Sequence, residues 1–80
     1  MQKRLGIIGI IIKDRNKAAA TVNTILSEYG EMIVGRMGLP FKERGLSIID
    51  LIVEADTDEV GALTGKIGMI DGVQVKSLLV

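Results

Sequence analysis

Apolar and polar residues follow one another along this chain with two different periods, and the change of period predicts six secondary-structure elements. Side chains return to the same face every second residue in a β-strand and every 3.6 residues in an α-helix. Runs rich in Ile, Leu and Val predict four strands, at 5–12, 32–37, 46–54 and 73–79. We expect Gly38-Leu39-Pro40 to end the second strand, because glycine and proline interrupt regular structure.

Two segments between the predicted strands have helical periodicity. In the first, which begins at Arg15, apolar residues fall three or four positions apart at Ala19, Val22, Ile25, Leu26 and Tyr29. In the second, which begins at Thr57, the corresponding residues are Val60, Leu63, Ile67 and Ile70. Such spacing places each set on one stripe of a helix. Gly30 fits the left-handed position just past the end of the first helix, and Asp71-Gly72 predicts a turn.

Aspartates stand at the start of both predicted helices. The carboxylate of Asp14 is predicted to accept hydrogen bonds from the free amides of the first helical turn. Asp56 is followed three residues later by Glu59, which is the spacing of a capping box. Asp58 adds a negative charge that favours the positive end of the helix dipole. Capping accounts for these carboxylates, so we predict neither a metal site at 56–59 nor a catalytic base at Asp14.

The order strand, helix, strand, strand, helix, strand predicts an α+β ferredoxin-like βαββαβ sandwich. Right-handed crossovers place both helices on one face of a four-stranded antiparallel sheet. The first and third strands are then central, and the second and fourth lie at the edges. With 80 residues, the chain forms a single domain, 1–80.

Both predicted central strands are apolar on their two faces. In the first, Leu5, Ile7 and Ile11 oppose Ile8, Ile10 and Ile12; in the third, Ile49, Leu51 and Val53 oppose Leu46, Ile48 and Ile52. A strand with one hydrated face should instead alternate apolar and polar residues. Monomers rarely expose contiguous apolar patches larger than a few hundred Å². We therefore expect a homo-oligomer, a dimer or a tetramer, that buries the open face or extends the sheet edge to edge; the alternative is a sheet with helices on both faces.

The composition excludes several kinds of site. The chain has ten Lys plus Arg, ten Asp plus Glu, no His and no Cys. Direct DNA binding is disfavoured, because affinity for phosphates needs excess positive charge. Imidazole and thiolate metal ligands are absent, so we predict no metal and no cofactor. The serines, Ser27, Ser47 and Ser77, lack the usual activating base, and we predict no catalytic residue and no enzymatic activity.

The N-terminus has a superficial likeness to a signal peptide, with Lys3-Arg4 followed by an apolar run. The charged segment 13–16 interrupts that run, and no small-residue cleavage site follows it. Eight apolar or glycine residues are also too few to span a bilayer. We predict a buried strand instead, no membrane association and a cytoplasmic location.

Glycine and basic residues supply further candidates for ligand binding or for close packing. Gly61, Gly65 and Gly68 share one helical stripe, although glycine costs about 1 kcal/mol within a helix. They indicate either close approach by a backbone or ligand, or a short, irregular helix. Segment 61–67 resembles a phosphate-binding loop, but its spacing is one residue short and Ile67 replaces the required Ser or Thr. Gly6 and Gly9 indicate close packing or a bulge.

Three basic residues flank the connection between the second and third strands. Arg36, Lys42 and Arg44 form either an anion clamp or a solvated loop.

Four segments carry a family resemblance that covers essentially the whole chain: RLGIIGI (4–10), ILSEYG (25–30), IVGRMGLP (33–40) and TDEVGALTGKIG (57–68). They resemble small regulators of the iron-only hydrogenase system, which belong with the ACT-like domains and are similar to the C-terminal domain of the nickel-responsive repressor. The resemblance implies a ferredoxin-like fold, oligomerisation and a regulatory, ligand-sensing role. That repressor binds nickel through His and Cys, which this chain lacks, so nickel sensing is not expected.

The resemblance also implies a position for a ligand. ACT-like domains often bind small molecules, commonly amino acids, between subunits near the first strand-to-helix loop. By position, Lys13, Asp14, Arg15 and Asn16 occupy that loop, and with Gly61 and Gly65 they are our candidate ligand-binding residues. The expected function is a small-molecule-sensing regulatory module, acting on transcription or on a protein partner. The alternative is a structural protein that scaffolds another protein without a ligand of its own.

Overall fold

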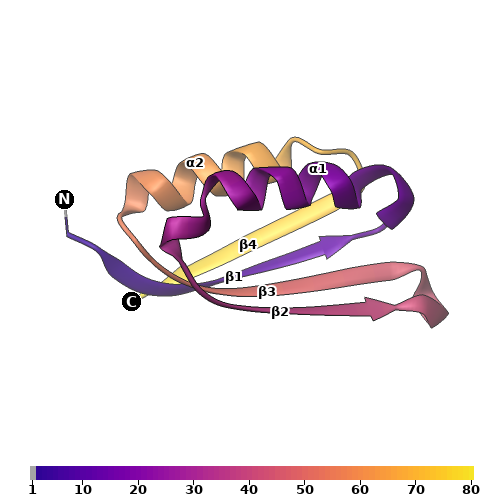
Figure 1. Cartoon of the computed structure of the whole chain (residues 1–80), viewed down its shortest axis with the longest axis horizontal. Coiled ribbons are helices and arrows are strands. Elements are labelled where there is room, and N and C mark those ends of the chain that lie inside the picture. Colours follow the sequence, from indigo (N-terminus) through magenta and orange to yellow (C-terminus); the bar gives the residue numbers. More distant parts are fainter. Residues whose placement is uncertain (1) are drawn as a thin grey trace.

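Four β-strands form one antiparallel sheet, and two α-helices lie on one of its faces (Figure 1). The computed structural model describes residues 2–80, except for the side chain of Arg15. The elements are β1 (Arg4–Ile12), α1 (Arg15–Glu28), the short 3-10 helix η1 (Gly30–Met32), β2 (Ile33–Phe41), the 3-10 helix η2 (Lys42–Arg44), β3 (Leu46–Ala55), α2 (Thr57–Gly68) and β4 (Val73–Leu79). The strand order β2-β3-β1-β4 makes β1 and β3 central, which confirms the predicted ferredoxin-like topology.

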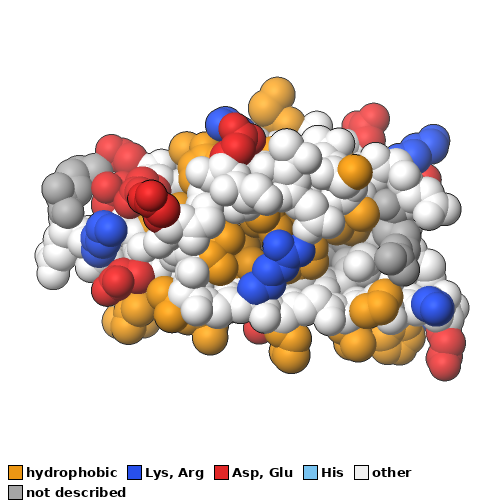
Figure 2. Space-filling model, viewed as in Figure 1, with side chains coloured by type: hydrophobic (Ala, Val, Ile, Leu, Met, Phe, Trp, Pro, Cys, Tyr) orange, Lys and Arg blue, Asp and Glu red, His pale blue; other side chains and the backbone are white. Residues whose placement is uncertain are grey.

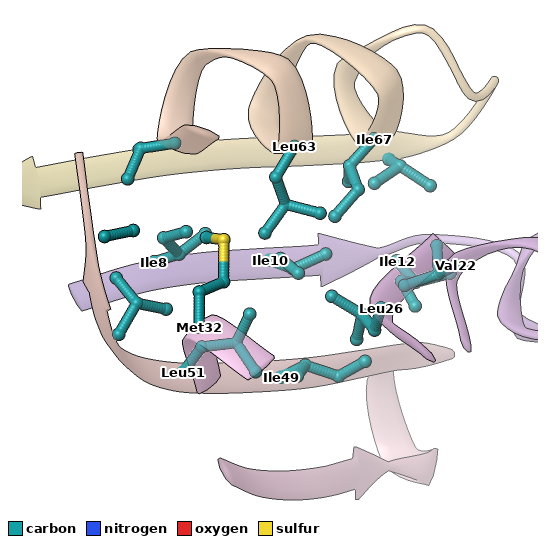
Figure 3. Packing of buried hydrophobic residues seen from close by; sticks show 14 of the residues in the cluster. Ile8, Ile10, Ile12, Val22, Leu26, Met32, Ile49, Leu51, Leu63 and Ile67 are labelled. Carbon is teal, nitrogen blue, oxygen red and sulfur yellow. The ribbon is translucent and has the colours of Figure 1, made fainter. Parts of the chain in front are cut away.

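The hydrophobic core lies between the sheet and the helices (Figure 3). Alternate residues of the central strands point into it: Ile8, Ile10 and Ile12 from β1, and Ile49, Leu51, Val53 and Ala55 from β3. The helices contribute Ala18, Val22 and Leu26 from α1, and Val60, Leu63 and Ile67 from α2. Burial of one such aliphatic side chain contributes about 1.5–3 kcal/mol. This packing holds both helices against a single face of the sheet, as predicted.

The two helices begin differently. At α2, the Asp56 carboxylate accepts from the Glu59 amide at 2.8 Å, and the Asp56 amide donates to the Glu59 carboxylate at 3.1 Å. The predicted capping box is therefore confirmed. At α1, Asp14 holds the N-cap position, but its side chain makes no capping hydrogen bond. The prediction for the Asp14 carboxylate is thus wrong, because the backbone at this residue (φ −126°, ψ 86°) is not the extended capping conformation that Asp56 adopts (φ −81°, ψ 169°).

The strand β2 is longer than predicted and continues through Gly38 and Pro40 to Phe41. It pairs only with β3, with Pro40 opposite Ser47. An edge strand tolerates proline because some of its backbone N–H positions face away from the neighbouring strand. The prediction that Gly38-Leu39-Pro40 ends the strand is wrong for this reason. A register shift at 33–35 marks a bulge near the start of β2.

The end of α1 also departs from the prediction. Gly30 is not left-handed: among the described residues, the glycines with positive φ are Gly45 (65°) and Gly72 (78°). The Tyr29 amide instead donates to the Leu26 carbonyl, and the chain tightens directly into η1. On the packed side of α1 the buried alanine is Ala18, with Ala19 only partly buried.

Candidate functional site

Three connections of the fold meet at one end of the sheet. They are the β1–α1 loop, the η2 connection between β2 and β3, and the turn between α2 and β4 (Figure 1). The Lys13 amide donates to the Gly72 carbonyl at 2.7 Å, which fixes the first connection to the third. The positive φ values of Gly45 and Gly72 permit the tight turns there. We call this end of the molecule the loop corner.

Two shallow hollows lie in the loop corner. One has a volume of about 260 Å³ and is lined by Lys13, Asp14, Asn16, Lys42, Gly45 and Leu46. The other, of about 410 Å³, is lined by Asp14, Lys17, Ala18, Ile70, Asp71 and Gly72. Asp14 borders both. The structure thus brings Lys13, Asp14 and Asn16 of the predicted site together; the side chain of Arg15 lies outside the described part of the chain.

The charges of the loop corner suit a small molecule that carries both an acid and an amine. Free amides at a helix N-terminus and the helix dipole attract a carboxylate. The Asp14 side chain makes no capping hydrogen bond to α1, and Lys13 and Lys42 add positive charge at the smaller hollow. The Asp14 carboxylate offers an acceptor for an ammonium group. Among residues 2–80, no three His, Cys, Asp or Glu side chains gather closely enough to hold a metal ion.

Gly61 and Gly65 lie apart from the loop corner. Both are on the exposed side of α2, roughly opposite Val60, Leu63 and Ile67. A Cβ atom built on either glycine would meet no atom within 4 Å. Neither residue lines either of the hollows described above. Nothing in the described chain approaches these two glycines closely, so they form an open surface of the helix.

The basic residues Arg36, Lys42 and Arg44 do not converge. Arg36 points toward the helices, where its guanidinium donates to Oδ1 of Asn23 on α1. Lys42 begins η2, six residues farther along, and six extended residues span about 20 Å. Of the three, only Lys42 contributes to the loop corner hollows. This arrangement does not form the anion clamp that the sequence left open.

The sheet face away from the helices carries most of the exposed large apolar side chains of residues 2–80. We call it the open face; its apolar residues are Leu5, Ile7, Ile11, Met37, Leu39, Phe41, Leu46, Ile48, Ile52 and Leu78. Orange side chains follow the lower edge of the molecule in Figure 2, beneath the sheet. Ile7 and Ile52, on the two central strands, are 49% and 50% exposed. The division of β1 and β3 into two apolar faces is confirmed.

Part of the open face was missed from the sequence. Leu39 and Phe41 join Met37 on this face because β2 continues past Gly38, and the three residues alternate as strand residues should. Gly9 leaves a gap in the face, since a Cβ there would touch nothing within 4 Å. A hollow of about 560 Å³ lies beside Gly9 and extends over β4, lined among others by Ile11, Ile48 and Lys76.

Within residues 2–80, neither α1 nor α2 is long and apolar enough to cross a membrane.

Comparisons with known proteins identify the family. A family model described as "TM1266-like: Iron-only hydrogenase system regulator, putative" matches residues 4–77. Among solved structures, the uncharacterized protein TM1266 from Thermotoga maritima is 42% identical and superposes with a TM-score of 0.95, over 99% of each chain. No curated protein matches the chain significantly. These matches agree with the resemblance carried by the four sequence segments. The chain therefore belongs to the TM1266-like family, whose members are described as regulators of the iron-only hydrogenase system.

Proposed function

We propose that this chain is a non-catalytic regulatory module that self-associates and senses a small polar molecule at its loop corner. The observation that carries the proposal is the position of that corner at the end of β1. Lys13 directly follows Ile12, and Ile11, one residue earlier, belongs to the open face. A ligand that orders the β1–α1 loop therefore acts at the border of the surface through which copies associate.

The proposed ligand is a free amino acid or a similar zwitterion. Its carboxylate would face the uncapped start of α1 and the ammonium groups of Lys13 and Lys42. Its amine would face Asp14. Family membership supports a regulatory role, and the likeness to ACT-like domains supports this class of ligand. Binding would bias the module between two arrangements, because a ligand shifts an equilibrium only by its different affinity for the two states.

Thermal unfolding in the presence of a panel of free amino acids and small dicarboxylates tests the sensing role. At a hundredfold excess of ligand over Kd, stabilisation is about 2.7 kcal/mol. For a domain of this size, such a gain raises Tm by about 10 °C or more. Lys13→Ala and Lys42→Ala should each weaken the response. Lys3→Ala is the matched control, because it removes the same charge from an exposed position before β1, at the other end of that strand.

Native mass spectrometry of gently purified protein separates this proposal from a scaffolding role. A dimer or tetramer that retains extra mass supports sensing. If no compound of the panel raises Tm and the oligomer carries no extra mass, the ligand-sensing role is wrong. A protein bound in fixed stoichiometry, without any ligand effect, would then assign the chain to scaffolding.

A further inference from the structure

The strand register aligns the open face into rows that cross all four strands. One row is Leu78, Ile7, Ile52 and Gly35, and another is Gln74, Ile11, Ile48 and Leu39. The row between them is Lys76, Gly9, Asp50 and Met37. Residues directly opposite one another in antiparallel strands point to the same side of the sheet. Two rows that are apolar except for Gln74 therefore enclose a central row, in which Asp50 lies on one side of Gly9 and Lys76 on the other.

The open face is large enough to support a stable dimer. Four strands of seven to ten residues, spaced about 4.8 Å apart and rising about 3.3 Å per residue, cover roughly 550 Å². Two such faces in contact bury roughly 1,100 Å² in total, above the ~1,000 Å² expected of a specific interface. The side chains available for burial are well exposed, with Leu78 at 68% and Met37 at 67%. No helix of the described chain covers them (Figure 1).

The charges of the central row are self-complementary. Asp50 and Lys76 are both exposed and stand on the two strands that flank β1. Their Cα atoms are two strand spacings apart, about 10 Å. A two-fold interface presents the same patch from both copies, so an acid and a base placed symmetrically about the axis each meet the opposite charge. Gly9, which lies between them, carries no side chain that would obstruct this pairing.

We infer that a second copy of this chain covers the open face in a two-fold dimer, with the axis along β1 at Gly9 and Asp50 of each copy opposite Lys76 of the other. This inference rests on the self-association in the proposed function and specifies its geometry. Stacked sheets keep their strands within about 30° of each other and lie about 10 Å apart. In this arrangement Ile7 meets Ile7, Ile11 meets Ile11, and Leu78 meets Ile52 of the second copy.

A second two-fold arrangement also stacks the two sheets with their strands aligned, and the charges of the central row distinguish between the two. With the axis perpendicular to the strands at Gly9, Asp50 would face Asp50 and Lys76 would face Lys76. Like charges brought together in an interface disfavour that register. The axis along β1 replaces both repulsions with attractions. It also places the two loop corners at the same end of the dimer, next to the border between the copies.

A mixing experiment with two charge-reversal variants tests the pairing. Asp50→Lys gives a chain with two bases in the central row, and Lys76→Asp gives a chain with two acids. Each variant alone should raise the dimer dissociation constant by about tenfold or more, the scale found for close interfacial charge pairs. Mixed in equal amounts, they should form a heterodimer about as tight as the unmodified dimer, because every acid then meets a base. Glu31→Lys, which reverses an exposed charge in η1, is the control and should leave association unchanged.

Sedimentation equilibrium measures each dissociation constant, and circular dichroism verifies that each variant is folded. If both variants weaken association and mixing does not restore it, the register inferred here is wrong. If Asp50→Asn tightens the dimer, the axis lies across the strands instead. If the unmodified chain dimerises but no charge variant affects it, the interface lies elsewhere, and the self-association in the proposed function stands. If the unmodified chain is a monomer at all concentrations, this inference and that self-association both fail.

Discussion

The two faces of the sheet are built from the same types of apolar residue, but only one face is covered by helices. On β1, Ile10 is fully buried beneath the helices, whereas its neighbour Ile11 on the open face is 36% exposed. On β3, Leu51 is fully buried and Ile52 is 50% exposed. Both crossovers place their helices on one side of the sheet, so this chain supplies one layer for two apolar faces. An apolar face without a covering layer indicates that the second layer comes from another molecule.

Truncation of the two neighbouring isoleucines of β1 should give the largest contrast. Ile10→Ala leaves a cavity in the core and should lower the free energy of unfolding by about 2–5 kcal/mol. Ile11→Ala removes side-chain atoms that already contact water and should lower it by about 1 kcal/mol or less. Urea unfolding at protein concentrations below the dimer dissociation constant measures both values. Equal losses would mean that the open face is covered within the monomer.

Gly6 and Gly9 of β1 face opposite sides of the sheet, so substitution of each by alanine compares the space available on the two faces. A Cβ on Gly6 would lie 2.6 Å from the Leu78 carbonyl oxygen, so Gly6→Ala must displace β4 and should cost about 1–3 kcal/mol. A Cβ on Gly9 would meet open space, and alanine is favoured over glycine within a strand by about 0.5–1 kcal/mol. We therefore expect Gly9→Ala to leave monomer stability unchanged or slightly raised. A destabilised Gly9→Ala monomer would show that this position is already occupied.

On the covered face, the starts of α1 and α2 differ in whether an aspartate side chain caps the helix. Asp56→Ala removes a carboxylate that accepts from Glu59 and should cost about 1 kcal/mol. Asp14→Ala removes a carboxylate without a capping bond and should change the free energy of unfolding by less than about 0.5 kcal/mol. Thermal unfolding of both variants measures the difference. A loss at Asp14 equal to that at Asp56 would show that both helices are capped in solution.

The smallest expected effect concerns Lys66, whose ammonium nitrogen lies 5.1 Å from the centre of the Tyr29 ring. Its hydrogen bond and charge interaction with Tyr29, and the charge of Glu28, raise the pKa of Lys66 above its usual 10.5. A raised folded-state pKa stabilises the fold below pH 10.5 and loses that effect as pH rises through the folded value. Lys66→Met should therefore lower Tm slightly and equally from pH 6 to 9. A change in this difference within that range would contradict the assignment.

The sequence predicts the fold well because the signals that define it are local. Periodicity locates β1, β3, β4 and both helices, and Asp56 with Glu59 marks the start of α2. The length of β2 is not predicted, because Gly38 and Pro40 are local signals that would end a central strand, whereas an edge strand such as β2 tolerates both. The predicted strand ends at Met37, so the contribution of Leu39 and Phe41 to the open face is missed as well.

The candidate site depends on contacts between distant parts of the chain. Lys13, Asp14 and Asn16 could be singled out by their place in the fold, but Lys42 joins them only because η2 and the β1–α1 loop end at the same side of the sheet. Similarly, Asp50 and Lys76 become partners of Gly9 through strand register. A one-residue shift in the register of β3 or of β4 would turn the charge on that strand to the other face.

The central claim is that the open face is the surface through which copies associate, and substitution of Ile52 tests it most directly. Ile52 lies on a central strand, half exposed, so Ile52→Lys adds a charge to the face without entering the core. Analytical ultracentrifugation should find the unmodified chain as a dimer or larger oligomer and Ile52→Lys as a folded monomer with an unchanged far-ultraviolet spectrum. A monomeric unmodified chain, or an Ile52→Lys variant that associates as strongly, would contradict the claim.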